Sequence, residues 1–189
     1  MLRYIFSDFR NDFPKILKPC LLFVLAVLAG CLLPSLFSAD TKALAGDISG
    51  QLLAGIQGKS QLNRICFWGE FLPYGLLVLV LWLSGGGRFG IIPATATLLG
   101  FGLLWGIGIN LVFSMGFAYG ILVFLICMLP GNLLIAAAFV LIIIIILRQD
   151  HNYLRYSYDF LVPLVMVFAA CWYLVFAGPH LLNLVIKLI

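Results

Sequence analysis

The stretch from Ile91 to Leu147 constrains this chain more than any other feature, because its 57 residues include no Asp, Glu, Lys, Arg or His. About 20 apolar helical residues cross the ~30 Å hydrocarbon core of a bilayer. The rest of the chain is similar: its mean hydropathy is +1.17, and 10% of its residues are charged, against about 25% in soluble domains. These observations predict an all-α, polytopic transmembrane helical bundle.

Further apolar runs occupy residues 20–37, 71–83 and 160–177. The polar segments between the runs are too short for a soluble domain of ordinary size. Residues 1–189 are therefore expected to form a single integral membrane domain in the cell membrane.

The basic residues predict its orientation, because cytoplasmic loops carry an excess of Lys and Arg. Seven of the eleven fall in three segments that this rule places inside the cell: Arg3, Arg10, Lys15, Lys18, Arg88, Arg148 and Arg155. The chain then crosses the membrane an even number of times between Arg88 and Arg148. The N-terminus is expected in the cytoplasm and the C-terminus outside.

The uncharged stretch is too long for two crossings of ~20 residues and slightly short for three. A broken or re-entrant segment would absorb the excess of roughly fifteen residues. Pro130, Gly131 and Asn132 favour a break, since proline lacks a backbone donor, glycine permits unusual torsions and asparagine can bond the freed backbone. We expect five full spans plus a kink or hairpin near Pro130. The alternative is six spans, with Arg148 outside.

Two segments have helical apolar periodicity outside the spans. Residues 1–18 are expected to form a cytoplasmic amphipathic helix on the membrane surface. In the external loop 38–63, four apolar residues recur every four positions and form a candidate partner surface: Leu44, Ile48, Leu52 and Ile56. This loop could rest on the outer leaflet, pack on the bundle or receive a partner. Gly178 and Pro179 are expected to end the last span, with residues 180–189 at the outer interface.

Catalytic chemistry is not indicated. The two histidines, His151 and His180, lie in segments expected on opposite sides of the membrane, and HExxH, GxSxG and paired-carboxylate patterns do not occur. The five cysteines lie in or beside apolar runs without CxxC spacing, which predicts neither a disulfide framework nor a zinc site. We therefore expect no enzyme, no metal and no cofactor. The scattered basic residues do not indicate nucleic-acid binding.

Three polar residues in apolar sequence are candidates for function. Glu70 could be a proton or cation ligand, but its position six residues after Arg64 and beside Trp68 favours an interfacial or ion-paired carboxylate. Asn110 and Asn132 are expected to satisfy broken backbone or to bond between helices rather than to bind substrate.

Glycines in the uncharged stretch form two small-xxx-small patterns. Gly102 with Gly106, and Gly116 with Gly120, would allow close helix packing. The packing partner could be another helix of this chain or a second copy.

The order of several short motifs resembles one known family. Residues 99–106, 116–120, 129–134 and 147–149 resemble the stage II sporulation protein M family, over nearly the whole chain. The triple-glycine turn at 85–87 and the isoleucine-rich 140–147 depart from that family's pattern.

This resemblance implies a non-catalytic multi-pass scaffold. Members of the family work with the stage II sporulation proteins D and P, which are peptidoglycan hydrolases, in septal wall remodelling and engulfment. The implied role is to localise such membrane-anchored hydrolases. The alternative is a small membrane transporter, or the membrane subunit of one, which the break near Pro130 and Glu70 would suit.

Overall fold

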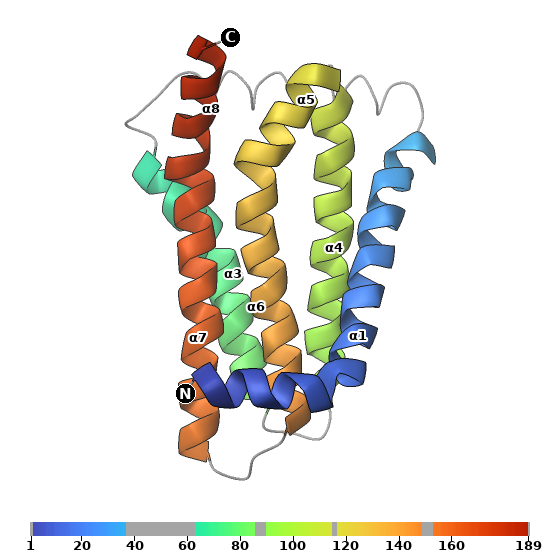
Figure 1. Cartoon of the computed structure of the whole chain (residues 1–189), viewed down its shortest axis with the longest axis vertical. Coiled ribbons are helices and arrows are strands. Elements are labelled where there is room, and N and C mark those ends of the chain that lie inside the picture. The colour runs from blue at the N-terminus through green and yellow to red at the C-terminus, as the bar shows by residue number, and fades with distance from the viewer. Residues whose placement is uncertain (1, 37–62, 86–89, 115–116, 149–152, 189) are drawn as a thin grey trace.

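The computed structural model describes residues 2–36, 63–85, 90–114, 117–148 and 153–188, and every element in these ranges is helical (Figure 1). The elements are α1 (Leu2–Leu32), the 3₁₀ turn η1 (Leu33–Leu36), α3 (Asn63–Gly85), α4 (Ile91–Ser114), α5 (Phe117–Val123), the π turn η2 (Phe124–Met128), α6 (Leu129–Arg148), α7 (Tyr153–Trp172), the π turn η3 (Tyr173–Ala177) and α8 (Gly178–Leu188). The expected all-α class is confirmed for the described residues.

Four helices are long and apolar enough to cross a membrane: Phe67–Ser84, Ile91–Ser114, Gly120–Leu147 and Asp159–Val185. A shorter apolar helix, Leu17–Leu32, lies beside α4. Figure 1 shows these helices running roughly alongside one another. We call the end where α3 ends and α4 begins the lower end, and the opposite end, which carries the C-terminus, the upper end.

Helix α1 has two parts. Its first turns lie across the lower end of the bundle, and the rest rises beside α4 (Figure 1). Pro14 and Pro19 both fall in this helix, and prolines bend helices because each removes a backbone donor and crowds the carbonyl four residues before it. The helix expected over residues 1–18 is therefore the first part of a longer, bent helix.

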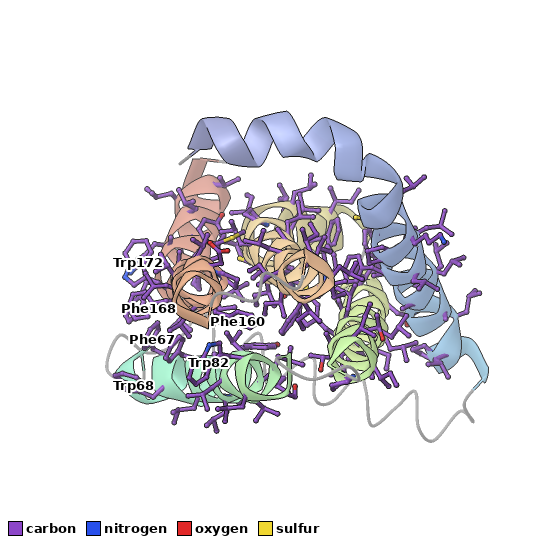
Figure 2. All side chains as sticks on the ribbon, turned by 90° about the horizontal axis from the view of Figure 1, so that it is seen from below. Phe67, Trp68, Trp82, Phe160, Phe168 and Trp172 are labelled. Carbon is purple, nitrogen blue, oxygen red and sulfur yellow. The ribbon has the colours of Figure 1, made fainter. Side chains whose placement is uncertain are left out.

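Helix α6 forms the centre of the core. Ile135, Phe139 and Ile142 on α6 are almost completely buried, as are Val167 and Cys171 on α7. Helix α6 packs against α7 on one side and α4 on another, and Figure 2 shows it between them when the bundle is seen from below. A helix with neighbours on several sides is expected to be apolar all round, which explains its isoleucine-rich sequence.

Of the kink or hairpin expected near Pro130, the described residues show an interrupted helix and not a hairpin. The chain from Phe117 to Arg148 is one helix interrupted by the π turn η2, and its direction does not reverse (Figure 1). The excess length of the uncharged stretch is absorbed because this helix is longer than a minimal span: its apolar part, Gly120–Leu147, has 28 residues.

The predicted end of the last span was wrong. Gly178 and Pro179 open α8, which continues from α7 through η3, and the apolar helix Asp159–Val185 has 27 residues. The π turn explains the continuation, because its wide backbone directly precedes Pro179 and reduces the clash that would otherwise end the helix.

Candidate functional site

The two π turns lie against each other between the α5–α6 and α7–α8 helices. The hydroxyl of Tyr173, the first residue of η3, donates a hydrogen bond of 2.6 Å to the backbone carbonyl of Ile126 in η2. This bond joins residues 47 positions apart in the chain. The breaks in the two longest apolar helices are thus one site in space.

Proline explains why the carbonyl of Ile126 needs a partner. In an α-helix, that carbonyl would accept from the backbone N–H of residue 130, and Pro130 has none. A buried carbonyl without a partner costs about 1–3 kcal/mol. The Tyr173 hydroxyl supplies the missing donor from the neighbouring helix.

Both π turns end directly before a proline. The N–H of Leu129 bonds the carbonyl of Phe124, and the N–H of Gly178 bonds the carbonyl of Tyr173, each spanning five residues. Pro130 and Pro179 follow at the next position. The sequences share a pattern of aromatic residue, leucine, β-branched residue, three further residues and proline, at 124–130 and 173–179. This repeat was not predicted from the sequence, although the identical spacing of the two patterns could have revealed it.

Two glycines allow the π turns to approach. A Cβ at Gly131 would collide with the side chain of Leu174, and one at Gly178 would lie 3.2 Å from the Cα of Cys127. Each glycine therefore faces the other helix across the site.

Asn132 lies one position beyond Gly131 in the first turn of α6 and is 9% exposed. It is a polar side chain within the packed part of the bundle. The structure thus places Pro130, Gly131 and Asn132 together at the π-turn site.

Asn110 serves a different helix end. Its side-chain amide donates a 3.0 Å hydrogen bond to the backbone carbonyl of Cys31, near the end of α1. The chain continues there into the 3₁₀ turn Leu33–Leu36, in which this carbonyl would accept from residue 34. Residue 34 is Pro34, which has no N–H. Asn110 therefore caps a carbonyl at the C-terminus of α1.

The first glycine pair lies in the interface between α1 and α4. A Cβ at Gly106 would collide with the carbonyl of Val27 and would lie 2.8 Å from the Cα of Gly30. A Cβ at Gly102 would lie 2.9 Å from the Cβ of Ala26. Sequence analysis did not single out Gly30, which completes the contact from α1. Both helix backbones meet closely here.

The second glycine pair is described only in part. A Cβ at Gly120 would lie 2.8 Å from the carbonyl of Val112, so this glycine packs α5 on α4. Gly116 lies outside the described residues, as do Leu44, Ile48, Leu52 and Ile56.

Glu70 lies on the exposed surface of α3. Its neighbours in sequence, Trp68 and Phe71, belong to an aromatic cluster with Phe67, Phe168, Trp172 and Phe176. Trp68 is 54% exposed and Trp172 is 52% exposed, and Figure 2 shows both at the outside of the bundle. Trp68 lies at the beginning of the apolar helix Phe67–Ser84, a position typical of a tryptophan at a membrane–water interface.

The serine and threonine hydroxyl groups of α3 and α4 donate to the backbone of their own helix. Thr97 donates to the carbonyl of Pro93 at 2.8 Å, Ser84 to Leu81 at 3.3 Å and Ser114 to Leu111 at 2.6 Å. Such bonds satisfy a hydroxyl within its own helix.

The part of the chain that the structure describes contains no group of three or more His, Cys, Asp and Glu side chains suited to a metal ion. Cys20, Cys31, Cys127 and Cys171 are free thiols. Asn110 and Tyr173 each bond the backbone of a neighbouring helix.

Comparisons with protein-family models, with curated proteins and with solved structures find no match for this chain.

Proposed function

We propose that this protein is a non-catalytic scaffold that crosses the cell membrane five times, with its N-terminus in the cytoplasm and its C-terminus outside. The crossings are the helix that begins near Leu17, α3, α4, the α5–α6 helix and the α7–α8 helix. The shorter first helix is extended by η1. The basic residues favour this orientation by the positive-inside rule.

One observation carries the proposal: several polar side chains in the apolar helices bond the chain's own backbone. Asn110 bonds Cys31, Tyr173 bonds Ile126, and Thr97 bonds Pro93. A path for a hydrophilic solute needs polar groups free to replace its water. Polar side chains that already bond the backbone cannot replace the water of a solute, which favours a structural role over a transport path.

The resemblance to the stage II sporulation protein M family supplies the partner class. On this proposal, the scaffold localises membrane-anchored peptidoglycan hydrolases related to the stage II sporulation proteins D and P during septal remodelling. The external segment 38–63 supplies the contact surface through Leu44, Ile48, Leu52 and Ile56. The exposed apolar face of α3, which includes Leu72, Leu76 and Leu83, suits the membrane anchor of a partner.

The test is co-purification of the tagged chain with the hydrolases of its own cell membrane after crosslinking. We expect the wild type to recover the hydrolases. The triple change Leu44→Asp, Ile48→Asp and Leu52→Asp is expected to release them, with the bundle still folded. The matched control places Asp at three polar positions of the same segment: Ser49, Gln51 and Gln57. Equal recovery by both variants would contradict the assigned surface, and a wild type that recovers no hydrolase would contradict the partner class.

A transporter is the second candidate, and the paired π turns favour it. Helices interrupted at the same level, with a buried asparagine beside the break, are features of transport sites. Wild-type protein in proteoliposomes would then move a solute, and Asn132→Ala or Glu70→Gln would abolish uptake. A wild type that neither moves nor binds any solute in a broad panel would contradict this candidate.

A further inference from the structure

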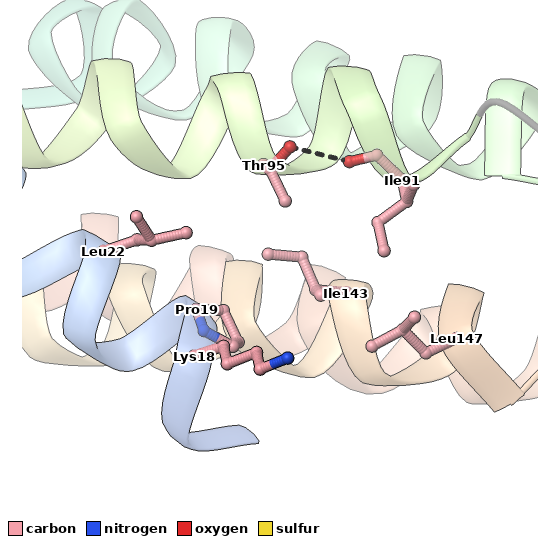
Figure 3. A pocket seen from close by; sticks show the side chains of 7 residues that line it. All are labelled: Lys18, Pro19, Leu22, Ile91, Thr95, Ile143 and Leu147. Carbon is pink, nitrogen blue, oxygen red and sulfur yellow. Dashed lines mark hydrogen bonds between the residues drawn. The ribbon is translucent and has the colours of Figure 1, made fainter. Parts of the chain in front are cut away.

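A cavity of about 360 Å³ opens at the lower end of the bundle, between α1, α4 and α6. Its lining is formed by Lys18, Pro19 and Leu22 of α1, Ile91 and Thr95 of α4, and Ile143 and Leu147 of α6 (Figure 3). Its volume falls within the range of small-molecule sites, ~300–1,000 Å³. None of its lining residues belongs to either π turn.

The lining is apolar apart from one charge. Thr95 already donates its hydroxyl to the backbone carbonyls of Ile91 at 2.9 Å and Ile92 at 3.0 Å, and Figure 3 shows the first of these bonds. Leu22 and Leu147 are 43% and 42% exposed, so the apolar wall continues onto the outer surface of the bundle. An occupant must therefore be largely hydrocarbon and must enter from the side.

Lys18 supplies the charge. It lies at the exposed edge of the cavity, one residue before Pro19. A lysine at such an edge keeps its ammonium in water while its stem follows the apolar wall. Two further basic residues lie close in the sequence of the same helices: Lys15 precedes Lys18 by three residues, and Arg148 follows Leu147 as the last residue of α6.

The charge balance of the two ends points the same way. Among the residues that the structure describes, the helix segments at the lower end hold six basic and three acidic residues, a net charge of +3, whereas the remaining segments hold two basic residues and one acidic residue, a net charge of +1. The acidic residues of the lower segments are Asp8, Asp12 and Asp159. An anion is the favoured partner at this end.

We propose that this cavity binds an acidic phospholipid, with one acyl chain between α1, α4 and α6 and the phosphate of the headgroup at Lys18. Basic pockets between transmembrane helices at the cytoplasmic surface suit anionic headgroups. A free anion would use only Lys18 and leave the apolar wall empty, whereas a phospholipid uses both. The proposal requires the membrane embedding proposed above, but it does not depend on a hydrolase partner.

The experiment is native mass spectrometry of the full-length protein, released from bilayers that contain equal amounts of phosphatidylglycerol and phosphatidylcholine. We expect the wild type to retain phosphatidylglycerol several-fold over phosphatidylcholine. Lys18→Gln removes the charge at an exposed position and is expected to bring this ratio close to one. The matched control, Lys187→Gln in α8, is expected to keep the wild-type ratio.

A second pair of variants tests the apolar wall. Leu22→Trp places a large side chain at the mouth of the cavity and is expected to reduce retention of both lipids. Leu104→Trp adds the same bulk on α4 at a residue that is 69% exposed and does not line the cavity, and it is expected to have little effect. Each variant is first checked for its helical content and its elution volume.

Three results would overturn the proposal. Lys18→Gln could retain phosphatidylglycerol as the wild type does, the wild type could retain neither lipid or both equally, or millimolar inorganic phosphate could displace the lipid. The last result would identify a site for a soluble anion. None of these results bears on the recovery of hydrolases, so the two proposals fail separately.

Discussion

Two regions of the bundle meet the same difficulty in different ways. In the α1–α4 pair, Pro34 leaves the carbonyl of Cys31 without a 3₁₀ partner at the end of α1. Asn110 of α4 donates to that carbonyl, beside the close glycine contact between the two helices. In the π-turn pair, Pro130 leaves the carbonyl of Ile126 without a partner inside a helix, and the Tyr173 hydroxyl donates to it.

The difference lies in what happens to the helix. Near Pro34, α1 ends at Leu32 and the chain continues in the 3₁₀ turn Leu33–Leu36. At Pro130, the helix widens by one residue and continues for the 20 residues of α6. Each of these two carbonyls receives a side-chain donor from a neighbouring helix, but only the π turn before Pro130 lets the helix continue past the proline.

The largest expected effect comes from a bulky side chain in the glycine contact between α1 and α4, which Gly30, Gly102 and Gly106 form. Gly106→Leu places a side chain where a Cβ would already collide with the carbonyl of Val27, so α1 must separate from α4. We expect loss of the folded bundle, measured as loss of the monodisperse peak and of cooperative thermal unfolding in detergent.

The matched control is Gly100→Ala on the same helix, where a Cβ would meet nothing within 4 Å. This change is expected to leave the unfolding temperature unchanged or to raise it, because alanine favours the helix by up to about 1 kcal/mol. A folded Gly106→Leu protein would show that the bundle does not need the close glycine contact between α1 and α4.

An intermediate effect is expected from the cap of α1. Asn110→Leu removes the donor to the carbonyl of Cys31 and leaves that carbonyl unsatisfied, which costs about 1–3 kcal/mol. We expect a lower midpoint of unfolding by denaturing detergent. Thr97→Val on the same helix removes a hydroxyl that bonds only its own helix, and a smaller shift is expected. Equal shifts would contradict a capping role for Asn110.

The smallest expected effect comes from the π turns, where it tests whether the Tyr173 hydroxyl compensates for the N–H that Pro130 lacks. Tyr173→Phe keeps the ring and removes the donor to the carbonyl of Ile126, with an expected cost of about 0.6–2 kcal/mol for a bond between apolar helices. Pro130→Ala restores a backbone N–H at the position that this carbonyl would use in an α-helix. Tyr173→Phe is therefore expected to cost less in the Pro130→Ala background than in the wild type.

A double-mutant cycle of the unfolding free energies measures this coupling. Additive costs of the two changes would show that the tyrosine hydroxyl does not compensate for the proline.

The sequence predicted the features that depend on local chemistry. The long uncharged run required apolar helices, and the spacing of Gly102 and Gly106 indicated a close helix contact. Asn110 was expected to satisfy broken backbone or to bond between helices, and its bond to Cys31 joins α4 to the backbone of α1.

The features that the sequence did not predict depend on neighbours distant in the chain. The sequence allowed a kink or a hairpin near Pro130 without deciding between them, and it ended the last span at Gly178 and Pro179, where the helix in fact continues. The donor that bonds Ile126 comes from Tyr173, 47 residues away, and the space beside Gly131 is filled by Leu174. These contacts exist only once α6 and α7 have packed together.

The central claim is a bundle that crosses the membrane five times, with the lipid cavity at the cytoplasmic face and the partner segment outside. Single cysteines at Lys42→Cys and Asp150→Cys, in a chain whose five native cysteines are replaced by alanine, can be labelled in intact cells with a membrane-impermeant maleimide. The account predicts that position 42 reacts in intact cells, whereas position 150 reacts only after the membrane is permeabilised. Labelling of position 150 in intact cells would contradict the account, because it would place the α6–α7 connection outside.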